Sequence, residues 1–508
     1  MPGRIGFEIK LGASAEAPQH PLRRSDSMRI IVLGDFSGRR NRGVETADDL
    51  AARRVFEVDL DSFESVFRAL APGLAISSVP VPGAALSLSF ESLEDFHPDQ
   101  LYASLDAFRE LRSSRERLLD PASFDAEAER LVAAGTARDE TARSSSSAPQ
   151  AAEDQARLLE RLIGAPPVGP QNEAATGRAV DGLVRALVKP HIKPGFSRSP
   201  DPYLAALDAS AGELMRALLH DPDFQALEAG WRGLRRLVDS VELGQQVKLW
   251  VADVSKGELL EDLAASEGRL EESSAYRLIV DSGRRGVDDP PWSLLLGDYA
   301  FAADQDDISL LAHLGQLASS AGAPFLAAAD SSLAGCEQLR ADTEPRKWAY
   351  GDQTIEEQWM ALRRSPVARW LGLALPRVLM RLPYGPRTDA IESFKFEEMT
   401  SATDHEAYLW GNPALACGMV LAASFLDEPT DMRTSGPLEI EDLPACVRDI
   451  DGERQLMPCA EVLLPIRVGE ELQRRGMIAL LSHSDRNAVR ILELRSVAEP
   501  TLALAGLA

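Results

Sequence analysis

Four short apolar runs between residues 247 and 329 of this 508-residue chain constrain its fold more than any other feature. Strands that are apolar at almost every position are typical of a sheet covered by helices on both faces, whereas one exposed face would give alternation. A helical stretch from Ile308 to about Ser320 separates the last two runs. We therefore predict a large, mostly α/β domain with a mixed sheet over residues 173–508. The runs are residues 247–254, 276–281, 292–298 and 324–329.

A long amphipathic helix is predicted ahead of these strands. Six apolar residues there are spaced by three or four positions, so they form one continuous stripe on a helix. We expect this stripe to be buried. The six are Phe224, Leu227, Trp231, Leu234, Val238 and Val241.

The first part of the chain predicts a smaller α/β domain, which we assign to residues 1–133. Short strands are expected at residues 28–33, 55–60 and 86–90, separated by turn residues. A helix is expected to begin at Pro98 and to close this domain. Its apolar positions at helical spacing are Leu101, Leu105, Phe108, Leu111 and Leu118 or Leu119.

Residues 135–154, GTARDETARSSSSAPQAAED, contain almost no large apolar side chain. Such a segment cannot offset the entropy of ordering, which predicts a flexible linker between two units that can dock together. We assign residues 134–172 to this linker, including the short amphipathic sequence ARLLERLIG. That sequence predicts either a helix docked on its own domain or a helical peptide for a partner's groove. Its apolar residues are Leu158, Leu159, Leu162 and Ile163.

Composition limits the possible partners and the compartment. The chain has 54 Lys+Arg against 79 Asp+Glu, a formal net charge of -25, so nucleic acid is not expected as a partner. No run reaches about 18 apolar residues, so membrane insertion is not expected. The start, MPGRIGFEIK, shows no secretory signal pattern, and a cytoplasmic protein is predicted. The four cysteines form no C-x-x-C pair, which favours buried reduced thiols.

Motifs for catalysis are sparse. The sequence has no phosphate-binding GxxxxGK[ST] loop, no GxGxxG after a strand, no GxSxG and no HExxH, so no cofactor is predicted. Two stretches, IIVLGDFSG and SLLLGDYAF, place Gly34-Asp35 and Gly297-Asp298 after an apolar strand. These pairs are predicted to form structural turns, in which the carboxylates accept backbone hydrogen bonds. The alternative is a catalytic carboxylate at a strand end, as in many α/β enzymes.

Two further clusters have a structural and a functional interpretation. Asp404-His405-Glu406 is the densest group of possible metal ligands, but adjacent residues point in different directions and no second cluster follows, so no metal is predicted. A run of five arginines suggests either a polyanion site or, as we expect, ion pairs with carboxylates of this chain or of a neighbouring subunit. The arginines are Arg363, Arg364, Arg369, Arg377 and Arg381.

Longer strings resemble a known family. IIVLGDFSG, RRVFEVDLDSFESVF and FESLEDFHPDQLY resemble the small subunit of the contractile sheath of the type VI secretion system. The second part resembles the large sheath subunit, so the chain resembles a fusion of the two over roughly residues 1–130 and 155–500. The strings that carry this second resemblance are LLHDPDFQALEAGWRGLRRLV, VKLWVADVSKGEL, PWSLLLGDYAF, APFLAAA, LGLALPRVLMRLPYG, FEE and YLWGNPALACG.

The resemblance implies a structural protein and not an enzyme. Copies of the chain would form a helical homopolymer around an inner-tube protein, start from a baseplate, and contract to propel the tube. The resemblance also implies that protomers exchange strands with one another. The candidate for the exchanged strand is the segment with Ile5, Phe7 and Ile9. The alternative is that this segment pairs with the sheet edge of its own domain. A Clp-type AAA+ ATPase would recognise the helix that contains Leu158, Leu159, Leu162 and Ile163.

The resemblance also leaves alternatives open. Large sheath subunits usually continue for on the order of one hundred residues beyond the point that corresponds to Ala508, through strands that join the exchanged sheet. A non-polymerising accessory that docks on a sheath or baseplate is therefore a second hypothesis. An α/β enzyme that uses Asp35 or Asp298 is a third, from another class.

Overall fold

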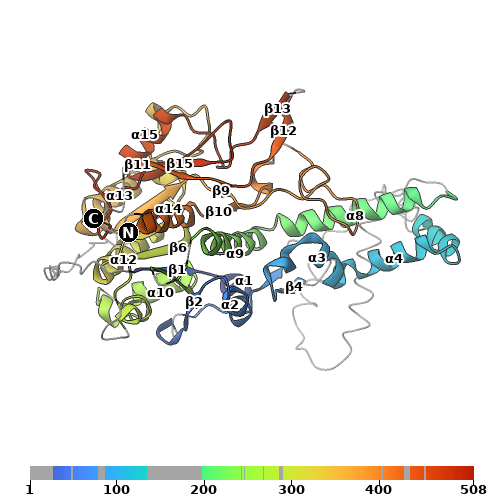
Figure 1. The fold of residues 1–508 in the computed structure, drawn as a ribbon, viewed down its shortest axis with the longest axis horizontal. Helices are drawn as coiled ribbons and strands as arrows, with labels where there is room; N and C mark the ends of the chain where they lie inside the picture. The colour runs from blue at the N-terminus through green and yellow to red at the C-terminus, as the bar shows by residue number, and fades with distance from the viewer. Residues whose placement is uncertain are drawn as a thin grey trace, which may run out of the picture.

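A nine-stranded mixed sheet forms the centre of the protein in the computed structural model (Figure 1). The strand order is β11-β15-β14-β8-β7-β6-β1-β5-β2. The six strands from β14 to β5 run parallel, and β2, β15 and β11 are antiparallel to their neighbours. The model describes residues 27–46, 50–77, 86–133, 197–241, 243–244, 246–266, 268–284, 290–401, 404–427, 435–450 and 453–507. The predicted α/β class is confirmed.

The strands of this sheet come from both ends of the chain. Two lie in the first segment, β1 (Met28–Gly34) and β2 (Val55–Val58). The other seven are β5 (Val247–Asp253), β6 (Leu294–Phe301), β7 (Phe325–Ala329), β8 (Leu371–Leu375), β11 (Ser435–Ile440), β14 (Met477–Ser482) and β15 (Val489–Glu493).

Strand β1 lies inside the sheet and not at its edge. It pairs in parallel with β5 on one side, where Met28 is opposite Val247, and with β6 on the other, where Ile30 is opposite Leu294. All seven of its residues are buried. The first segment therefore completes the sheet of the second, instead of docking onto it as a finished unit.

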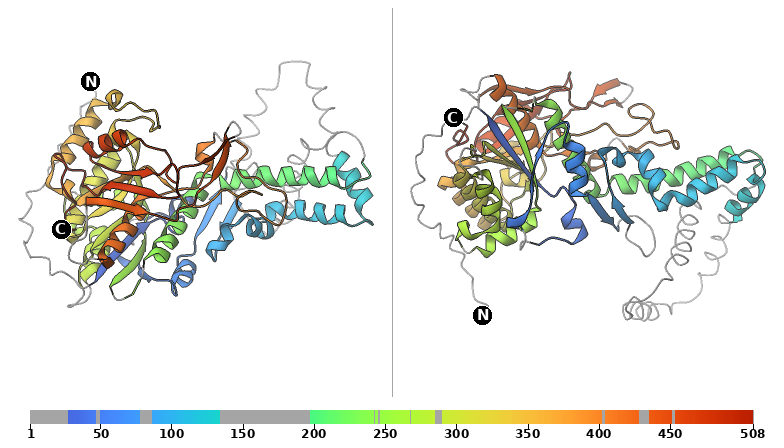
Figure 2. Two further views of the ribbon diagram at one scale, coloured as in Figure 1. Left: turned by 45° about the horizontal axis from the view of Figure 1, so that its top comes forward. Right: turned by 60° about the horizontal axis from the view of Figure 1, so that its bottom comes forward.

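Helices cover both faces of the sheet, as the apolar strands predicted (Figure 2). Ile30 and Val32 face a core with α8, α9 and α14, whereas Ile31 and Leu33 face a second core with α10 and α12. This alternation follows from the two-residue period of a strand. The helices are α8 (Asp201–Leu219), α9 (Pro222–Ser240), α10 (Lys256–Ala265), α12 (Gln305–Ala321), α13 (Gln353–Arg364), α14 (Pro413–Asp427) and α15 (Ile466–Arg474).

Small elements complete the described chain. In the first segment they are α1 (Arg39–Arg42), η1 (Leu50–Ala52), α2 (Phe63–Leu70), β3 (Gly73–Ile76), β4 (Leu86–Ser89), η2 (Leu93–Phe96), α3 (Pro98–Ser104), η3 (Asp106–Phe108) and α4 (Arg109–Leu119). In the second they are η5 (Leu270–Glu272), α11 (Ser274–Tyr276), η6 (Arg277–Asp281), η7 (Ser282–Arg284), η8 (Ser331–Ala334), η9 (Pro345–Lys347), η10 (Pro366–Trp370), β9 (Val378–Leu379), η11 (His405–Ala407), β10 (Trp410–Gly411), β12 (Val447–Ile450) and β13 (Glu453–Leu456).

An arm of helices projects from the sheet (Figure 1). It consists of α4, a further helix over residues 124–133 and the first part of α8. Phe124 packs against Tyr203 with ring centroids 6.1 Å apart, and Arg115 forms an ion pair with Asp208. The two segments therefore meet along the arm as well as in the sheet.

Two predicted elements, one strand and one helix, are wrong. Residues 276–281, predicted as a strand, form the end of α11 and the π-helical turn η6. A short apolar run fits a buried helix as well as a buried strand, and Ser273 starts the helix by accepting a hydrogen bond from the Tyr276 N–H at 3.0 Å. The single helix predicted from Pro98 is interrupted at Leu105, whose carbonyl accepts a hydrogen bond from Arg112 Nη1 at 3.2 Å.

The cysteines have the state that the sequence predicted. Cys336, Cys417, Cys446 and Cys459 are all free and buried. Burial in apolar surroundings raises the pKa of each thiol, and that of Cys417 reaches about 12. Cys336, Cys417 and Cys459 serve as small apolar side chains in the described cores.

Candidate functional site at the junction of the two segments

The helix α9 provides the apolar half of the junction between residues 27–133 and residues 197–507. Its buried Trp231 packs against Phe36, Phe63 and Phe67 of the first segment, with ring centroids 5.3, 5.8 and 4.3 Å away. The indole N–H donates a hydrogen bond to the Phe36 carbonyl at 2.8 Å. Aromatic clusters of this kind contribute both buried area and edge-to-face contacts. Trp231 is thus part of the predicted buried stripe, and the first segment supplies its partners.

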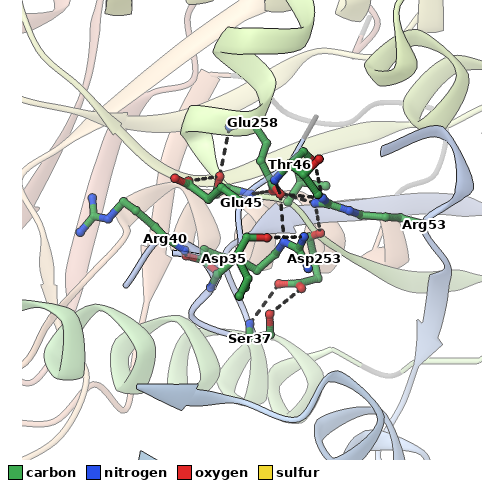
Figure 3. Close-up of polar contacts among 12 residues, drawn as sticks. Asp35, Ser37, Arg40, Glu45, Thr46, Arg53, Asp253 and Glu258 are labelled. Atoms are coloured by element: carbon green, nitrogen blue, oxygen red, sulfur yellow. Dashed lines mark hydrogen bonds and ion pairs between the residues drawn. The ribbon is translucent and has the colours of Figure 1, made fainter. Parts of the chain in front are cut away.

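Glu258, at the start of α10, is the centre of a polar network across the junction (Figure 3). Its two carboxylate oxygens accept hydrogen bonds from Arg53 at 2.6 and 2.7 Å. Arg39 Nε and the Thr46 N–H donate to the same carboxylate at 3.0 and 2.9 Å. Burial alone would raise the pKa of Glu258, but these donors and the N–H of Ser255 lower it to about 2. The side chain therefore carries a full negative charge that the first segment neutralises.

The same network continues to the ends of β1 and β5. Asp253, the last residue of β5, accepts hydrogen bonds from the N–H and the hydroxyl of Ser37 at 3.0 and 2.7 Å (Figure 3). Burial raises the pKa of Asp253. Ser255 donates its hydroxyl hydrogen bond to Glu45. Each of these bonds joins one segment to the other.

A second, buried ion cluster surrounds Arg381. Its guanidinium group donates to Glu228 at 2.9 Å and to both oxygens of Glu398 at 2.8 and 3.0 Å. The two carboxylates raise the pKa of Arg381, and Arg381 holds the pKa of Glu398 at about 2 despite burial. Tyr384 donates its backbone N–H to Glu398 at 2.7 Å. This cluster fixes the chain that follows β9.

That part of the chain also contacts the first segment. Asp99 on α3 accepts hydrogen bonds from the N–H groups of Glu392 and Ser393 at 3.0 and 2.9 Å. The rings of Tyr102 and Phe394 lie 4.9 Å apart. The chain after Arg381 thus packs along α3.

The two predicted Gly-Asp pairs lie side by side, because Leu33 of β1 is opposite Gly297 of β6. Asp35 follows β1 directly and accepts hydrogen bonds from the N–H groups of Arg39 and Arg40 at 2.6 and 3.0 Å. Both of its oxygens are therefore engaged at the start of α1.

For Gly297 and Asp298 the predicted turn is wrong. Both lie within β6, which continues to Phe301 past a register shift between Leu296 and Ala300. Gly297 is required by packing, since a Cβ there would be 2.5 Å from the ring of Phe325. Burial raises the pKa of Asp298 to about 6, and the neighbouring charge of Asp35 adds to the shift.

A cavity of about 700 Å³ opens at this end of the parallel strands. In α/β sheets the carboxyl ends of the strands are where ligands usually bind. The walls come from both segments, with Asp35 and Arg40 from the first and Asp298, Arg377 and Glu337 from the second.

The structure brings together one possible metal-ligand group among the described residues, His405, Glu406 and Glu461. Arg377 donates hydrogen bonds to Glu461 at 2.6 Å and to Glu406 at 3.0 Å, so both carboxylates are already paired with its positive charge. This geometry is an ion-pair cluster and a poor metal site. The sequence could not indicate Glu461, because it lies 56 residues beyond His405.

Three of the five arginines in the predicted basic run form ion pairs described here. Arg363 pairs with Glu499 at 2.7 Å, and Arg377 and Arg381 pair as described above. These contacts are with carboxylates of the same chain, which is one of the two expected outcomes.

Two other groups of predicted site residues lie outside the described part of the chain. They are the strand residues Ile5, Phe7 and Ile9 and the helix residues Leu158, Leu159, Leu162 and Ile163. Within the described residues, no helix is both long enough and apolar enough to cross a membrane.

Comparison with known proteins gives the class to which this fold and junction belong. The chain is a member of the tail sheath family described as EvpB/VC_A0108, whose N-terminal domain model matches residues 201–498, more than half of the chain. A second model, described as Type VI secretion system, VipA, VC_A0107 or Hcp2, matches residues 18–131. The predicted fusion of two sheath-subunit sequences in one chain is confirmed.

Two sheath proteins of Pseudomonas aeruginosa are similar to the two segments. The type VI secretion system sheath protein TssC1 is 31% identical over 309 residues, which are 60% of this chain and 62% of TssC1. The type VI secretion system sheath protein TssB1 is 24% identical over 119 residues, which are 23% of this chain and 64% of TssB1. The chain thus spans just under two thirds of the length of each relative.

Proposed function

We propose that this chain is a structural protomer of the contractile sheath of a type VI secretion apparatus, with both sheath subunits in one polypeptide. One observation supports this most directly. Strand β1, from the segment that matches the VipA model, lies between β5 and β6 of the segment that matches the tail sheath model. Two sequences that complete one sheet act as a single rigid building block, and fusion fixes their ratio at one to one.

In this proposal the protomers assemble helically in the cytoplasm around an inner-tube protein, starting from a baseplate, and the polymer contracts to propel the tube. Contraction would be a repacking between two states of the lattice, in which a small free-energy gap per protomer is multiplied along the polymer. No bond-making chemistry is needed. The engagement of Asp35 by two backbone N–H groups fits a structural role for that carboxylate.

Edge strands offer a route for contacts between protomers. In the described sheet β2 pairs only with β5, and β11 pairs only with β15, so each leaves one edge open. A strand from another copy can add to such an edge through backbone hydrogen bonds. The segment with Ile5, Phe7 and Ile9 is our proposal for that strand.

Electron microscopy of the purified chain, with and without inner-tube protein, tests the proposal. Long tubes of regular helical repeat are expected at high protein concentration. Discrete particles that bind preformed sheath or baseplate would instead identify the accessory. Monomers that bind neither tube protein nor one another at any concentration would contradict both.

The recycling partner is proposed to be a Clp-type AAA+ ATPase that binds the apolar side of residues 158–163. The variant Leu159→Asp should lose capture by the ATPase, because a charge in an apolar groove carries a large desolvation cost. Its melting temperature should equal that of the parent chain. Retained capture would show that this helix is not the recognition element.

A further inference from the structure

A groove of about 360 Å³ lies on the sheet at the amino-terminal ends of β1 and β5, beside β2. It is on the same side of the sheet as the core with α10 and α12, against which Trp250 and Val55 pack. On that side of β5, Ala252 is buried, whereas Lys248 and Trp250 are only partly buried. In the described part of the chain, the cover of this face therefore stops short of the start of the strands.

The floor of the groove is held in place by aromatic contacts. The guanidinium group of Arg29 lies 4.6 and 4.5 Å from the ring centroids of Trp250 and Trp292. Beside it, Lys248 and Glu57 form an ion pair at 3.2 Å, with side chains 42% and 54% exposed. A preformed surface with aromatic rings and a few charged groups is typical of a binding site.

The chain itself has a segment at this place. Ser27, the first described residue, lines the groove, so the chain enters β1 from there. The family model for the first segment begins at residue 18. Residues 18–26, PQHPLRRSD, therefore match the domain of the family and lie next to the groove in the sequence, outside the described residues.

The size of the groove favours an attached segment over a separate protein. Stable interfaces between proteins use roughly 20–30 residues on each side. Nine residues line this groove. A segment joined to Ser27 needs fewer contacts, because attachment gives it an effective concentration of about a millimolar.

We propose that residues 18–26 of this chain bind in the groove. Side chains two positions apart lie on the same side of an extended segment, which places Leu22 and Arg24 together. Leu22 then packs on the half-exposed ring of Trp250, and Arg24 pairs with Glu57 at the rim.

This inference goes beyond the proposed function, because the groove and the segment belong to one chain and need no assembly. Binding in the groove fixes the root of the N-terminal segment on the sheet. Only residues 1–17 are then left to reach another copy in a sheath.

Limited trypsin digestion of the full chain, at a concentration where it is unassembled, tests the proposal. The first 26 residues contain four cleavage sites. Arg4 and Lys10 precede the segment proposed to bind, and Arg23 and Arg24 lie within it. Cleavage at the second pair should be about tenfold slower than at Lys10, because cleavage follows the fraction of molecules in which the segment is released. Mass spectrometry of the products measures both rates.

Two variants should remove this protection. Leu22→Ser loses the apolar contact with the groove. Glu57→Lys repels Arg24 and changes an exposed side chain, so folding is not at risk. Each variant should speed cleavage within residues 18–26 about tenfold, since the segment is then released in most molecules.

Each variant has a matched control. Leu11→Ser makes the same change outside the segment proposed to bind. Glu272→Lys reverses the charge of another ion-paired side chain, which is 60% exposed and does not line the groove. Both controls should be cleaved within residues 18–26 as slowly as the parent chain.

The outcomes are independent of whether the chain forms tubes, so failure of this inference and failure of the proposed function are distinguishable. Protection in the parent and controls that both groove variants lose supports the inference. Equal cleavage at all four sites of the parent overturns it. Protection that both variants retain also overturns it and leaves the groove to residues 285–289, which precede Pro290 at its wall. Protection found only in assembled protein overturns it by placing the segment on a neighbouring copy.

Discussion

At the scale of single residues, Glu258 links the two segments through contacts that no local sequence pattern indicates. Its strongest partner, Arg53, is 205 positions away in the sequence, so no spacing rule relates them. The start of α10 was recognisable, because Ser255 and Glu258 form a capping box at the usual spacing. That the carboxylate also binds the first segment follows only from the fold.

The variant Glu258→Gln should lower the free energy of unfolding at pH 7 by about 2–4 kcal/mol, because it leaves Arg53 and Arg39 without their buried partner. The pKa of Glu258 is lowered to about 2 in the folded protein, so its contribution is present above pH 4.5 and is lost as the pH falls towards 2. Denaturant unfolding at several pH values measures both effects.

The control is Glu272→Gln, whose ion pair with Arg269 has side chains 60% and 64% exposed. It should change stability by less than about 0.5 kcal/mol. A similar small change in Glu258→Gln would mean that the network in Figure 3 adds nothing to the junction.

Asp298→Asn should have the opposite effect on stability. The pKa of Asp298 in the folded protein, about 6, lies above the ordinary value of 3.8, so the folded state disfavours the ionised form. The free energy of unfolding therefore falls as the pH rises from about 4 through 6 and Asp298 ionises. At pH 7.5 the variant should be more stable by about 1–2 kcal/mol, less than the roughly 3 kcal/mol of the whole shift because the cavity admits water. Near pH 4 the two proteins should be alike. A variant less stable than the parent at pH 7.5 would contradict the conclusion that the folded protein disfavours the ionised form of Asp298.

At the scale of elements, the apolar strands were predictable because burial on both faces leaves a local signature. The predicted strand at residues 28–33 is β1, and the one at residues 324–329 is β7, each within one residue of its observed ends. The run at residues 276–281 has the same signature and is helical, since periodicity cannot separate these cases over six residues. Strand order was not predictable, because β1 pairs with residues more than 200 positions away.

The interior position of β1 predicts its hydrogen exchange. Amides of residues 29–34 should exchange as slowly as those of β5 and β6, because they open only when the central sheet opens. Amides of the edge strand β2, from the same segment, should exchange faster. Mass spectrometry of exchanged peptides measures this, and equal rates for β1 and β2 would place β1 outside the sheet interior.

At the scale of the whole molecule, the sequence indicated two parts and a linker but not how the parts combine. Two docked units and one shared sheet would have the same apolar patterns, because the sequence of a strand indicates only that its faces are buried and not which strand lies beside it. The contacts of Trp231, Glu258 and Asp99 all cross between the segments. The protein is therefore best described as one folded unit made from two sheath-subunit sequences.

Cutting the chain between the segments tests this description most directly. A specific protease site inserted among Ser144–Ser147 lets the folded protein be cleaved there. Size-exclusion chromatography with light scattering should then show both fragments in one particle of the original mass, with a melting temperature within a few degrees of the uncut protein. Fragments that elute apart as two folded proteins would contradict the shared sheet.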